Sequence, residues 1–330
     1  MKLCDELEAE TESSMEAHQQ LVTCLLGSLT NSASNEELTA NWNRLSEHFD
    51  MLFTSPESID QMKQTILQLA VMGKLVPQNP KDPSARELLK EIEIEKERLI
   101  SEGKIKRSKP LQKIKPEETP YALPEGWEYF QLGGVILSID AGWSPKCEVF
   151  PAREHEWGVL KTTAVQPLLF LPHENKALPS KLTPRPDVQV QKNDILITRA
   201  GPKNRVGICC VANPIIPRLM LSDKIIRFHV INENIYPDFC ALCLNTGHGA
   251  EQIDKMKSGM ADSQMNISQD KLRAVILPLP PLAEQHRIVA KVDELMAICD
   301  QLSDRLREAE VTQAQLASTI TQNALKGESA

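Results

Sequence analysis

Two aspartates in the sequence have the local context in which a metal-dependent nuclease carries its first acidic ligand. Asp187 and Asp238 each follow a proline. Phosphodiester hydrolysis through bound Mg²⁺ also requires a second acid with a lysine two residues beyond it. No such Asp/Glu-x-Lys pair follows either aspartate, and Glu174-Asn-Lys176 lies upstream of both. The sequence therefore does not predict a nuclease site.

A second segment, Asn213-Pro214-Ile215-Ile216, has part of the loop with which amino-methyltransferases hold a target base. It lacks the second proline and the aromatic ring that would stack on the base, so we interpret it as a turn. The sequence also contains no Gly-x-x-x-x-Gly-Lys-Ser/Thr phosphate loop, no His-Glu-x-x-His metal motif and no Gly-x-Ser-x-Gly nucleophile turn. Together these absences predict a protein with no catalytic site, metal or cofactor of its own.

The pair Cys240-Ala-Leu-Cys243 has the spacing of half a zinc site. No second Cys-x-x-Cys pair completes a tetrahedral site, and His229 and His248 are the possible partners. We favour a buried pair of free thiols, because a chain without a secretory signal usually keeps its cysteines reduced. No apolar run approaches the roughly 20 residues that span a bilayer. We therefore expect a cytoplasmic protein with no membrane segment.

The elements that would position any site differ between the ends and the middle of the chain. No proline or glycine interrupts residues 283–326, and apolar side chains recur there at alternating spacings of four and three. This heptad pattern, interrupted at Gln313, predicts a long coiled-coil helix in residues 279–330. The side chains that we expect at its subunit interface are Ile288, Val292, Leu295, Cys299, Leu302, Leu306, Leu316 and Ile320.

The N-terminus repeats part of this helix. With a shift of 295 positions and no gap, Met1, Cys4, Asp5, Leu7, Gln20 and Leu21 coincide with Met296, Cys299, Asp300, Leu302, Gln315 and Leu316. Amphipathic helices share some of this pattern by chance, but the gapless match favours a true duplication. Such a repeat predicts a unit that is used twice around a pseudo-twofold axis.

The middle of the chain has the pattern of a mixed domain. Residues 59–72 and 84–101 have helical spacing, whereas 194–198, 206–211 and 224–230 are short β-branched runs bounded by turns. We predict an α+β protein in which one mixed α/β domain, residues 120–278, is flanked by long helices that form an antiparallel coiled coil. Residues 1–119 are then a helical region with a linker.

Charge is unevenly distributed over these regions. The chain has a formal net charge of −8, but residues 1–50 carry two cations against ten acids and residues 281–330 are also acidic. The segment between them is close to neutral or mildly basic. The run of cations from Lys104 to Lys115 is more consistent with a solvated linker than with a strand of cations along phosphates, although both remain open.

Several stretches resemble the specificity subunits of type I restriction–modification systems. The most specific is Leu277-Pro-Leu-Pro-Pro-Leu-Ala-Glu-Gln-His-Arg-Ile-Val289, which resembles the distal conserved region of that family. Leu123-Pro-Glu-Gly-Trp127 resembles the usual opening of a target-recognition domain. Further resemblances are Ile66–Gln78, Asn193–Gly201 and Met265-Asn-Ile-Ser268. Together they extend over nearly the whole chain.

The resemblance implies a DNA-recognition subunit that does not catalyse a reaction. Family members usually carry two recognition domains that read two half-sites of a bipartite target in double-stranded DNA. Their conserved helices separate the two domains and dock methyltransferase subunits. S-adenosylmethionine, Mg²⁺ and ATP are then expected on the partner methyltransferase and restriction/translocase subunits. This chain resembles a C-terminal half with one recognition domain, so we expect it to read one half-site.

Base reading needs hydrogen-bond donors and acceptors on exposed loops, and phosphate binding needs cations. The strongest candidate group surrounds the Gly201-Pro202 turn, where three cations follow the end of a predicted strand. The full set of candidate DNA-binding residues is Lys146, Lys161, Thr162, Arg199, Lys203, Asn204, Arg205, Lys255, Lys257, Ser258, Gln264 and Asn266.

Two further hypotheses remain open. In the first, the chain is a coiled-coil scaffold that holds methyltransferase subunits without reading DNA itself. In the other, two half-subunits form a homodimer, with the stripe at 288–320 facing a weaker stripe at Cys4, Leu7, Leu21 and Leu25.

Overall fold

The computed structural model describes residues 2–107 and 110–327, with side chains for residues 10, 12–107 and 110–322. The expected interface side chains Cys4 and Leu7 lie outside this set. The chain divides into two compact units, one of residues 1–70 with 290–330 and one of residues 71–289. We describe each unit by itself.

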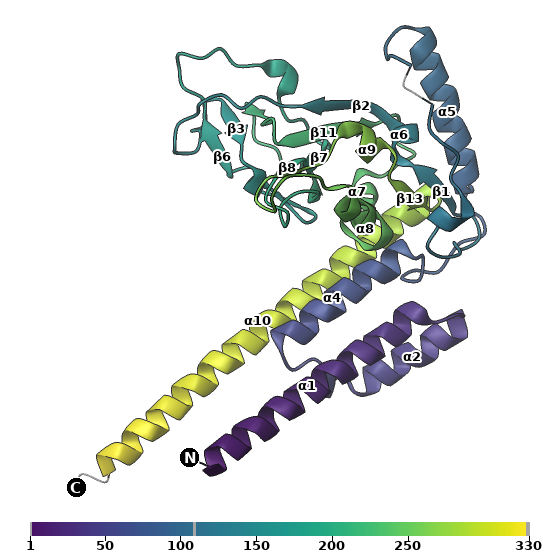
Figure 1. The fold of residues 1–330 in the computed structure, drawn as a ribbon. Helices are drawn as coiled ribbons and strands as arrows, with labels where there is room; N and C mark the ends of the chain where they lie inside the picture. The colour runs from purple at the N-terminus through teal and green to yellow at the C-terminus, as the bar shows by residue number, and fades with distance from the viewer. Residues whose placement is uncertain (1, 108–109, 328–330) are drawn as a thin grey trace. The chain divides into compact units, whose positions relative to one another are not determined.

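The first unit is helical throughout its described part. Helices α1 (Lys2–Asn31) and α2 (Asn35–Glu47) form an antiparallel hairpin, followed by the short helix α3 (Phe49–Leu52) (Figure 1). Ser34 caps α2, because its hydroxyl accepts a hydrogen bond from the amide of Glu37 at 3.2 Å. Apolar side chains on the inner face of the hairpin, Val22, Leu26, Leu29 and Leu45, are buried.

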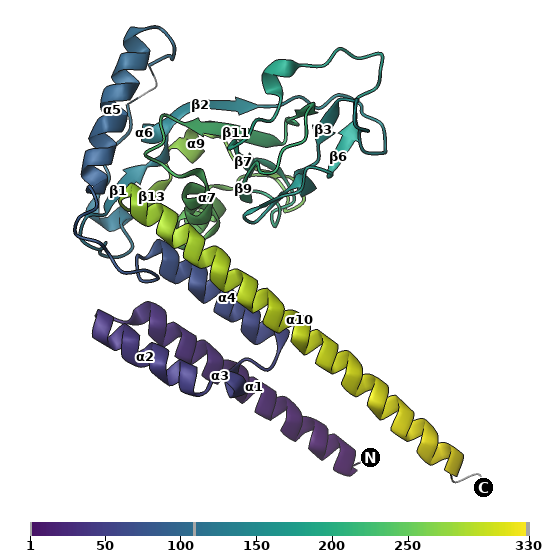
Figure 2. The same cartoon turned by 180° about the vertical axis from the view of Figure 1, so that it is seen from behind.

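Helix α4 (Pro56–Val71) runs beside α10 (Leu282–Gly327) in the same unit, as Figures 1 and 2 both show. An ion pair of 2.7 Å joins Lys63 of α4 to Asp300 of α10. The hydrogen bond from Asp300 raises the pKa of the Lys63 amine. The observed α10 confirms the predicted uninterrupted C-terminal helix. Its described side chains from Arg307 to Gln322 are all exposed.

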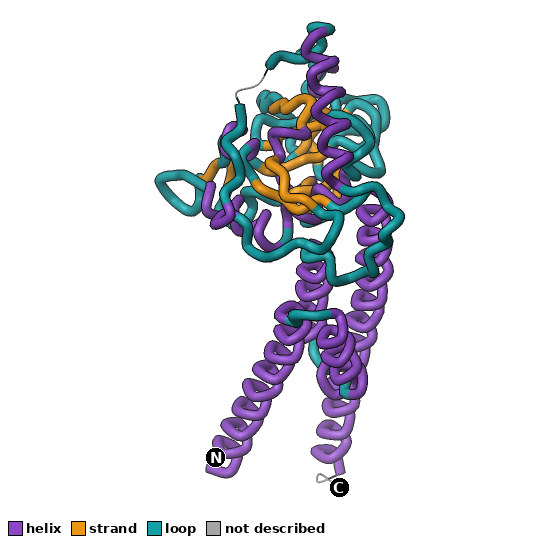
Figure 3. Tube along the Cα trace, turned by 90° about the vertical axis from the view of Figure 1, so that its right-hand side faces the viewer, coloured by secondary structure: helices purple, strands orange, loops and turns teal. Residues whose placement is uncertain are grey.

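The second unit contains the described strands, which Figure 3 shows in orange, together with shorter helices. It begins with α5 (Ala85–Ser101) and three 3₁₀ turns occur within it, at Pro116–Glu118, Thr162–Ala164 and Pro186–Val188. The remaining elements, in chain order, are β1 (Glu128–Gln131), α6 (Leu132–Val135), β2 (Ile136–Ala141), β3 (Gly158–Leu160), β4 (Val165–Gln166), β5 (Leu169–Phe170), β6 (Asn175–Ala177), β7 (Ile195–Thr198), β8 (Ala200–Gly201), β9 (Cys209–Val211), β10 (Leu219–Met220), β11 (Ile225–Val230), α7 (Pro237–Asn245), α8 (Gly247–Met256), β12 (Met265–Asn266), α9 (Gln269–Arg273) and β13 (Ile276–Leu279).

The largest sheet of this unit has the strand order β2-β11-β7-β9. All its pairs are antiparallel, with Ile226 opposite Ala141, Ile225 opposite Thr198 and Ile197 opposite Cys209. Its apolar core packs against β3, β4 and β5, and the buried side chains of this cluster are Leu160, Ala164, Val165, Phe170, Val190, Leu196, Cys210, Ala212, Leu219, Leu221 and Ile225. The sheet is open rather than closed into a barrel. These observations confirm the predicted mixed α+β fold.

Most of the predicted elements agree with the structure, with one clear difference. The strand expected over 206–211 begins only at Cys209. The preceding residues form a turn in which Gly207 has φ +90°, a conformation that favours glycine. The Cys240–Cys243 pair lies buried on α7, and the seven described cysteines are all free thiols. In the described part of the chain, no helix is both long and apolar enough to cross a membrane.

Candidate nucleic-acid interface

One end of the four-stranded sheet gathers loops that are far apart in the sequence. Because the strands alternate in direction, the ends of β2 and β7 lie beside the starts of β11 and β9. The segments 142–147, 199–208 and 221–224 therefore leave the sheet at the same end. We call these three segments the loop end of the sheet.

Arg199 and Lys224 lie opposite each other at the loop end. The amide of Arg199 donates a hydrogen bond of 2.8 Å to the carbonyl oxygen of Lys224. Neither side chain forms an ion pair or hydrogen bond with another described residue, and the buried Nε of Arg199 has no partner in that set. Lys224 was not among the sequence candidates. Its position just before a predicted strand gave no signal, since only the register with Thr198 places it beside Arg199.

The segment 142–147 lies against the start of β11. The amide of Trp143 donates to the carbonyl oxygen of Leu221 at 2.9 Å, and the hydroxyl of Ser144 bonds to the carboxylate of Asp223. Gly142 permits this approach, because a Cβ there would lie 2.0 Å from the Leu221 carbonyl oxygen. The candidate Lys146 follows in the same segment, where its side chain is exposed.

A β-hairpin, residues 258–266, extends the loop end. Its strand β12 pairs antiparallel with β8, with Met265 opposite Gly201. The amide of Lys203 donates to the carbonyl oxygen of Asp262 at 2.7 Å, and the amine of Lys257 donates to the carbonyl oxygen of Lys203 at 3.0 Å. This hairpin brings four further candidates beside the loop end, and all are exposed or half-buried: Lys257, Ser258, Gln264 and Asn266.

Arg205 has its guanidinium turned toward the protein. It donates hydrogen bonds to the Gln166 side chain at 3.0 Å and to the carbonyl oxygens of Thr162 and Val165, both at 2.9 Å. Arg205 thereby fastens the segment 161–166 to the loop end and brings Lys161 and Thr162 close to it. Lys161 itself is paired with Glu174 at 2.6 Å.

The remaining candidates are exposed and without an ion pair in the described structure. Asn204 lies between Lys203 and Arg205, and Lys255 lies in the last turn of α8, two residues before Lys257. Hydrogen bonds thus join, at the loop end, the segments of Thr162, Arg199, Lys203, Arg205, Lys257, Ser258 and Asn266, while Lys146, Lys161 and Lys255 are close in sequence to residues that make such contacts. The exposed candidates Lys146, Lys203 and Lys255 have no carboxylate partner in the described structure, and neither has Lys224, which was not a candidate. Together with half-buried Arg199 they leave positive charge free to bind an anion.

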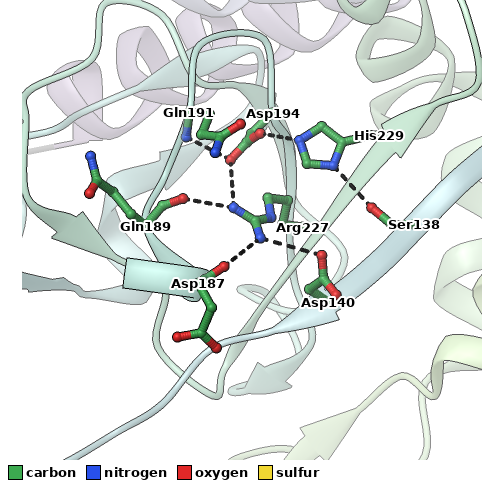
Figure 4. Close-up of polar contacts among 8 residues, drawn as sticks. All are labelled: Ser138, Asp140, Asp187, Gln189, Gln191, Asp194, Arg227 and His229. Carbon is green, nitrogen blue, oxygen red and sulfur yellow. Dashed lines mark hydrogen bonds and ion pairs between the residues drawn. The ribbon is translucent and has the colours of Figure 1, made fainter. Parts of the chain in front are cut away.

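A buried polar network lies on one face of the same sheet, toward the end opposite the loop end (Figure 4). The carboxylate of Asp194, fully buried, accepts a hydrogen bond from the amide of Gln191 at 2.8 Å. It also lies 2.5 Å from Nε2 of His229 and 3.4 Å from Nη1 of Arg227. His229 is therefore engaged with a carboxylate, not with the cysteines that were its alternative partners.

Arg227 of this network fastens a loop onto the sheet. Its guanidinium donates to the carbonyl oxygens of Gln189 at 2.7 Å and Asp187 at 3.1 Å, and pairs with Asp140 at 3.3 Å. Asp187, one of the two aspartates tested for nuclease chemistry, thus contributes its backbone to this contact. The sequence gave no signal for the network, because its members come from strands β2 and β11 and from the segment 187–194 that precedes β7.

The segment Leu277–Val289 anchors the start of α10 within the second unit. The fully buried side chain of Gln285 accepts from the amide of Tyr236 at 2.7 Å and donates to the carbonyl oxygen of Asn234 at 3.1 Å. Glu284 accepts from Gln78 at 3.2 Å, and Arg287 pairs with Asp82 at 2.8 Å. This explains in physical terms why the motif has consecutive polar residues at a helix start.

The predicted coiled-coil stripe is buried over only part of its length. Ile288, Val292 and Cys299 are buried, and Leu295, Leu302 and Leu306 are half-buried. In contrast, Leu316 and Ile320 are exposed to 58% and 67%. Whether these eight residues form a subunit interface stays a prediction.

Comparison with known proteins identifies the family. Residues 124–313 match the model of the type I restriction modification DNA specificity domain. The chain is 52% identical over 326 residues to the specificity subunit of the Escherichia coli type I restriction enzyme EcoEI, a match that covers 98% of this chain and 55% of that protein. The chain is also 38% identical over 335 residues to the specificity subunit of the Escherichia coli type I restriction enzyme EcoAI, and this match covers 98% of this chain and 54% of that protein.

Among solved structures, the HsdS subunit from Thermoanaerobacter tengcongensis is similar with a TM-score of 0.46 and 19% identity, over 93% of this chain and 58% of that one. The chain spans about half the length of the curated relatives that it matches. On the family model and the sequence relatives, the chain belongs to the family of type I restriction–modification DNA specificity proteins.

Proposed function

We propose that this chain recognises one half-site of a bipartite target in double-stranded DNA. The proposed reader is a recognition domain of residues 120–278. The observation that carries the proposal is the group of unpaired cations on adjoining loops, with Arg199, Lys203 and Lys224 at its centre. Cations without carboxylate partners bind phosphates and displace counterions, which supplies affinity. Exposed amides and hydroxyls among them, such as Asn204 and Gln264, are the groups that read base edges.

The division of labour that we propose follows from the relatives, which are specificity subunits of restriction enzymes. This chain would carry no catalytic residue and no cofactor. Methyltransferase subunits and a restriction/translocase subunit would be its partners, and they would hold S-adenosylmethionine, Mg²⁺ and ATP.

The experiment that tests DNA recognition begins with co-purification of the chain with its methyltransferase subunit. DNA treated with the complex and S-adenosylmethionine is then sequenced for methylated bases, and the salt dependence of binding is measured on the motif found. A double variant, Lys203→Ala with Lys224→Ala, should flatten the slope of log K against log salt by up to ~1.8, since each lost phosphate contact removes about 0.9.

The matched control is Lys192→Ala. Lys192 is also exposed and unpaired in the described structure, but it precedes β7 at the opposite end of the same sheet. It should leave the slope unchanged. Equal slopes for the double variant and the wild type, or a complex that methylates no defined motif, would overturn the proposal.

A second candidate function is supported by the exposed half of α10. Leu316 and Ile320, four residues apart and so on one face of α10, present apolar side chains with 58% and 67% exposure, and they continue a stripe that suits packing against another helix. If the stripe binds methyltransferase subunits, the chain is a scaffold that reads no DNA itself. If the stripe binds a second copy of the chain, two half-subunits form a homodimer that recognises a symmetric bipartite site.

The variant Leu316→Asp with Ile320→Asp separates these partners. The control Gln315→Asp with Thr319→Asp adds the same charges at exposed positions on an adjacent face of α10. Loss of methyltransferase co-purification only in the first variant would support docking at the stripe. A change in molar mass by light scattering would instead support a homodimer, and two variants that behave alike would exclude the stripe as an interface.

A further inference from the structure

The hairpin 258–266 is a loop closed by one antiparallel bridge, Ser258 with Asn266, and its strand β12 pairs with β8. The amides of Ser258 and Asn266 donate to each other's carbonyl oxygens at 3.0 and 2.8 Å. Gly259 allows the strands to approach, because a Cβ there would lie 2.2 Å from the carbonyl oxygen of Gln264. The hairpin is then held through β8 and Lys203, as described above.

Met260 lies in the exposed part of this hairpin, and its side chain is fully accessible, with a relative exposure of 104%. A single exposed apolar side chain needs no explanation on its own. The neighbours of Met260 within the hairpin, Ala261 to Gln264, are also exposed and include the carboxylate of Asp262. Lys257 is paired with Asp254 at 2.9 Å, whereas Lys203 borders the hairpin without a carboxylate partner among the described residues. An uncharged, flexible side chain thus lies exposed beside an unpaired cation.

The shape and the chemistry of the hairpin together indicate a groove of the duplex. The major groove, about 12 Å wide, admits an element as broad as a two-stranded β-ribbon, so a hairpin loop can enter it, and Lys203 would then lie near the phosphates on its rim. The principal apolar feature on the base edges in that groove is the C5-methyl group of thymine. Methionine is well suited to contact it, because its thioether chain is apolar and adapts its shape.

We propose that Met260 is a specificity-determining residue that contacts a thymine methyl group in the major groove of the half-site. The inference rests on the proposed function, since it requires that the loop end binds DNA. It adds to that function one named side chain and one chemical group on the substrate.

The test replaces each thymine of the methylated motif in turn by uracil, which lacks only the methyl group. Binding of the complex of the full chain with its methyltransferase subunit is measured for the wild type and for Met260→Ala. At one thymine, the wild type should lose about fourfold in affinity, the value of one buried methyl-sized group. Met260→Ala should bind the thymine and uracil duplexes equally at that position.

The matched control is Ile215→Ala. Ile215 is exposed to 42% on the loop that follows β9, at the other end of the sheet, so this variant should retain the wild-type discrimination. Because Met260 has no buried surface, its substitution should not alter the melting temperature, and a loss of binding cannot then be ascribed to unfolding.

The outcomes separate this inference from the proposed function. If the wild type binds a defined motif but Met260→Ala discriminates thymine from uracil as the wild type does, the Met260 contact is wrong and DNA recognition stands. If the half-site found contains no A·T pair, the Met260 contact is likewise wrong and DNA recognition stands. An equal loss of affinity for every duplex, together with a smaller DNA bend by energy transfer, would identify a wedge between bases instead. If no motif is bound, the proposed function itself fails.

Discussion

The four-stranded sheet holds cations in two contrasting settings. On its face, Arg227 is buried to 5% exposure and is paired with Asp194 and Asp140. At its loop end, Arg199 and Lys224 have no carboxylate partner in the described structure. A buried cation must be paired, because a lone charge in the interior carries a large desolvation cost. An exposed unpaired cation such as Lys224 has no such cost and stays available to a ligand, and half-buried Arg199 lies between the two settings. Position relative to solvent thus separates cations that stabilise the fold from cations that can bind DNA.

Removal of the buried carboxylate of Asp194 should have the largest effect on stability, because it turns Arg227 from a paired into a less well paired buried cation. Asp194→Ala leaves Arg227 and His229 without their shared partner, so the free energy of unfolding should fall by about 3–5 kcal/mol. Urea denaturation measures it. The control Lys192→Ala, two residues away but exposed, should stay within about 0.5 kcal/mol of the wild type. A loss below about 1 kcal/mol for Asp194→Ala would show that the network contributes little to stability.

Arg205 tests the boundary between the two settings, since it lies at the loop end but donates three hydrogen bonds to the protein. Arg205→Ala should lower the free energy of unfolding by about 1.5–3 kcal/mol, the range for hydrogen bonds to a charged group. Amide exchange should increase in residues 162–166, which Arg205 holds. Unchanged exchange there would contradict a fastening role and would favour direct contact with DNA.

Arg199 should show the opposite behaviour. Arg199→Ala should weaken binding of the specific DNA by about 1–3 kcal/mol, the range for a base or phosphate contact made by arginine. Its free energy of unfolding should change by no more than about 0.5 kcal/mol. Fluorescence anisotropy and urea denaturation on the same samples measure both values. A variant that loses stability but keeps its affinity would place Arg199 with the structural cations.

The smallest effect is expected at the pair Lys161–Glu174. Hydrogen bonds from Lys161 and Thr163 lower the pKa of the Glu174 carboxyl. The ionised form therefore stabilises the fold above the unfolded pKa of about 4.3, and this contribution is lost as pH falls through the lowered folded pKa. Because the pair is partly exposed, Glu174→Gln should cost less than about 1 kcal/mol at pH 7.

The same variant sharpens the comparison from the side of DNA binding. Glu174→Gln removes a negative charge and frees Lys161, so affinity for DNA should rise slightly while stability falls slightly. The stability difference from the wild type should vanish in acid, below the lowered pKa. A difference that persists at low pH would point to packing rather than to the ion pair.

The sequence predicted what depends on local pattern. The uninterrupted helix from Leu282 to Gly327 follows from heptad spacing without proline, and the strands β7 and β11 follow from β-branched runs between turns. The family motif at Leu277–Val289 could be recognised in the sequence, but its hydrogen bonds to Asn234 and Tyr236 could not be predicted from it.

What the sequence did not predict depends on register and on side-chain direction. Lys224 joins Arg199 only because β11 pairs with β7 in one particular register. Arg205 and Arg199 have similar sequence contexts, yet the Arg205 guanidinium turns toward Thr162 and Val165, while that of Arg199 forms no hydrogen bond or ion pair with a described residue. Asp194, Arg227 and His229 meet across strands more than 30 positions apart. Contacts between side chains so far apart in the sequence cannot be predicted from the periodicity of one sequence.

The strand order β2-β11-β7-β9 has a consequence for how this protein can change over evolutionary time. Each segment of the loop end is encoded by a separate short stretch of the gene. The strands between these segments hold the buried residues of the sheet, and the segments themselves hold exposed candidate residues. A substitution at an exposed position of 142–147, of 199–208 or of the hairpin 258–266, such as Lys146, Asn204 or Gln264, alters one part of the surface and leaves the backbone hydrogen bonds between these segments in place. A new DNA-sequence preference can therefore arise by substitution in one loop, while the sheet that holds the loops keeps its strand order.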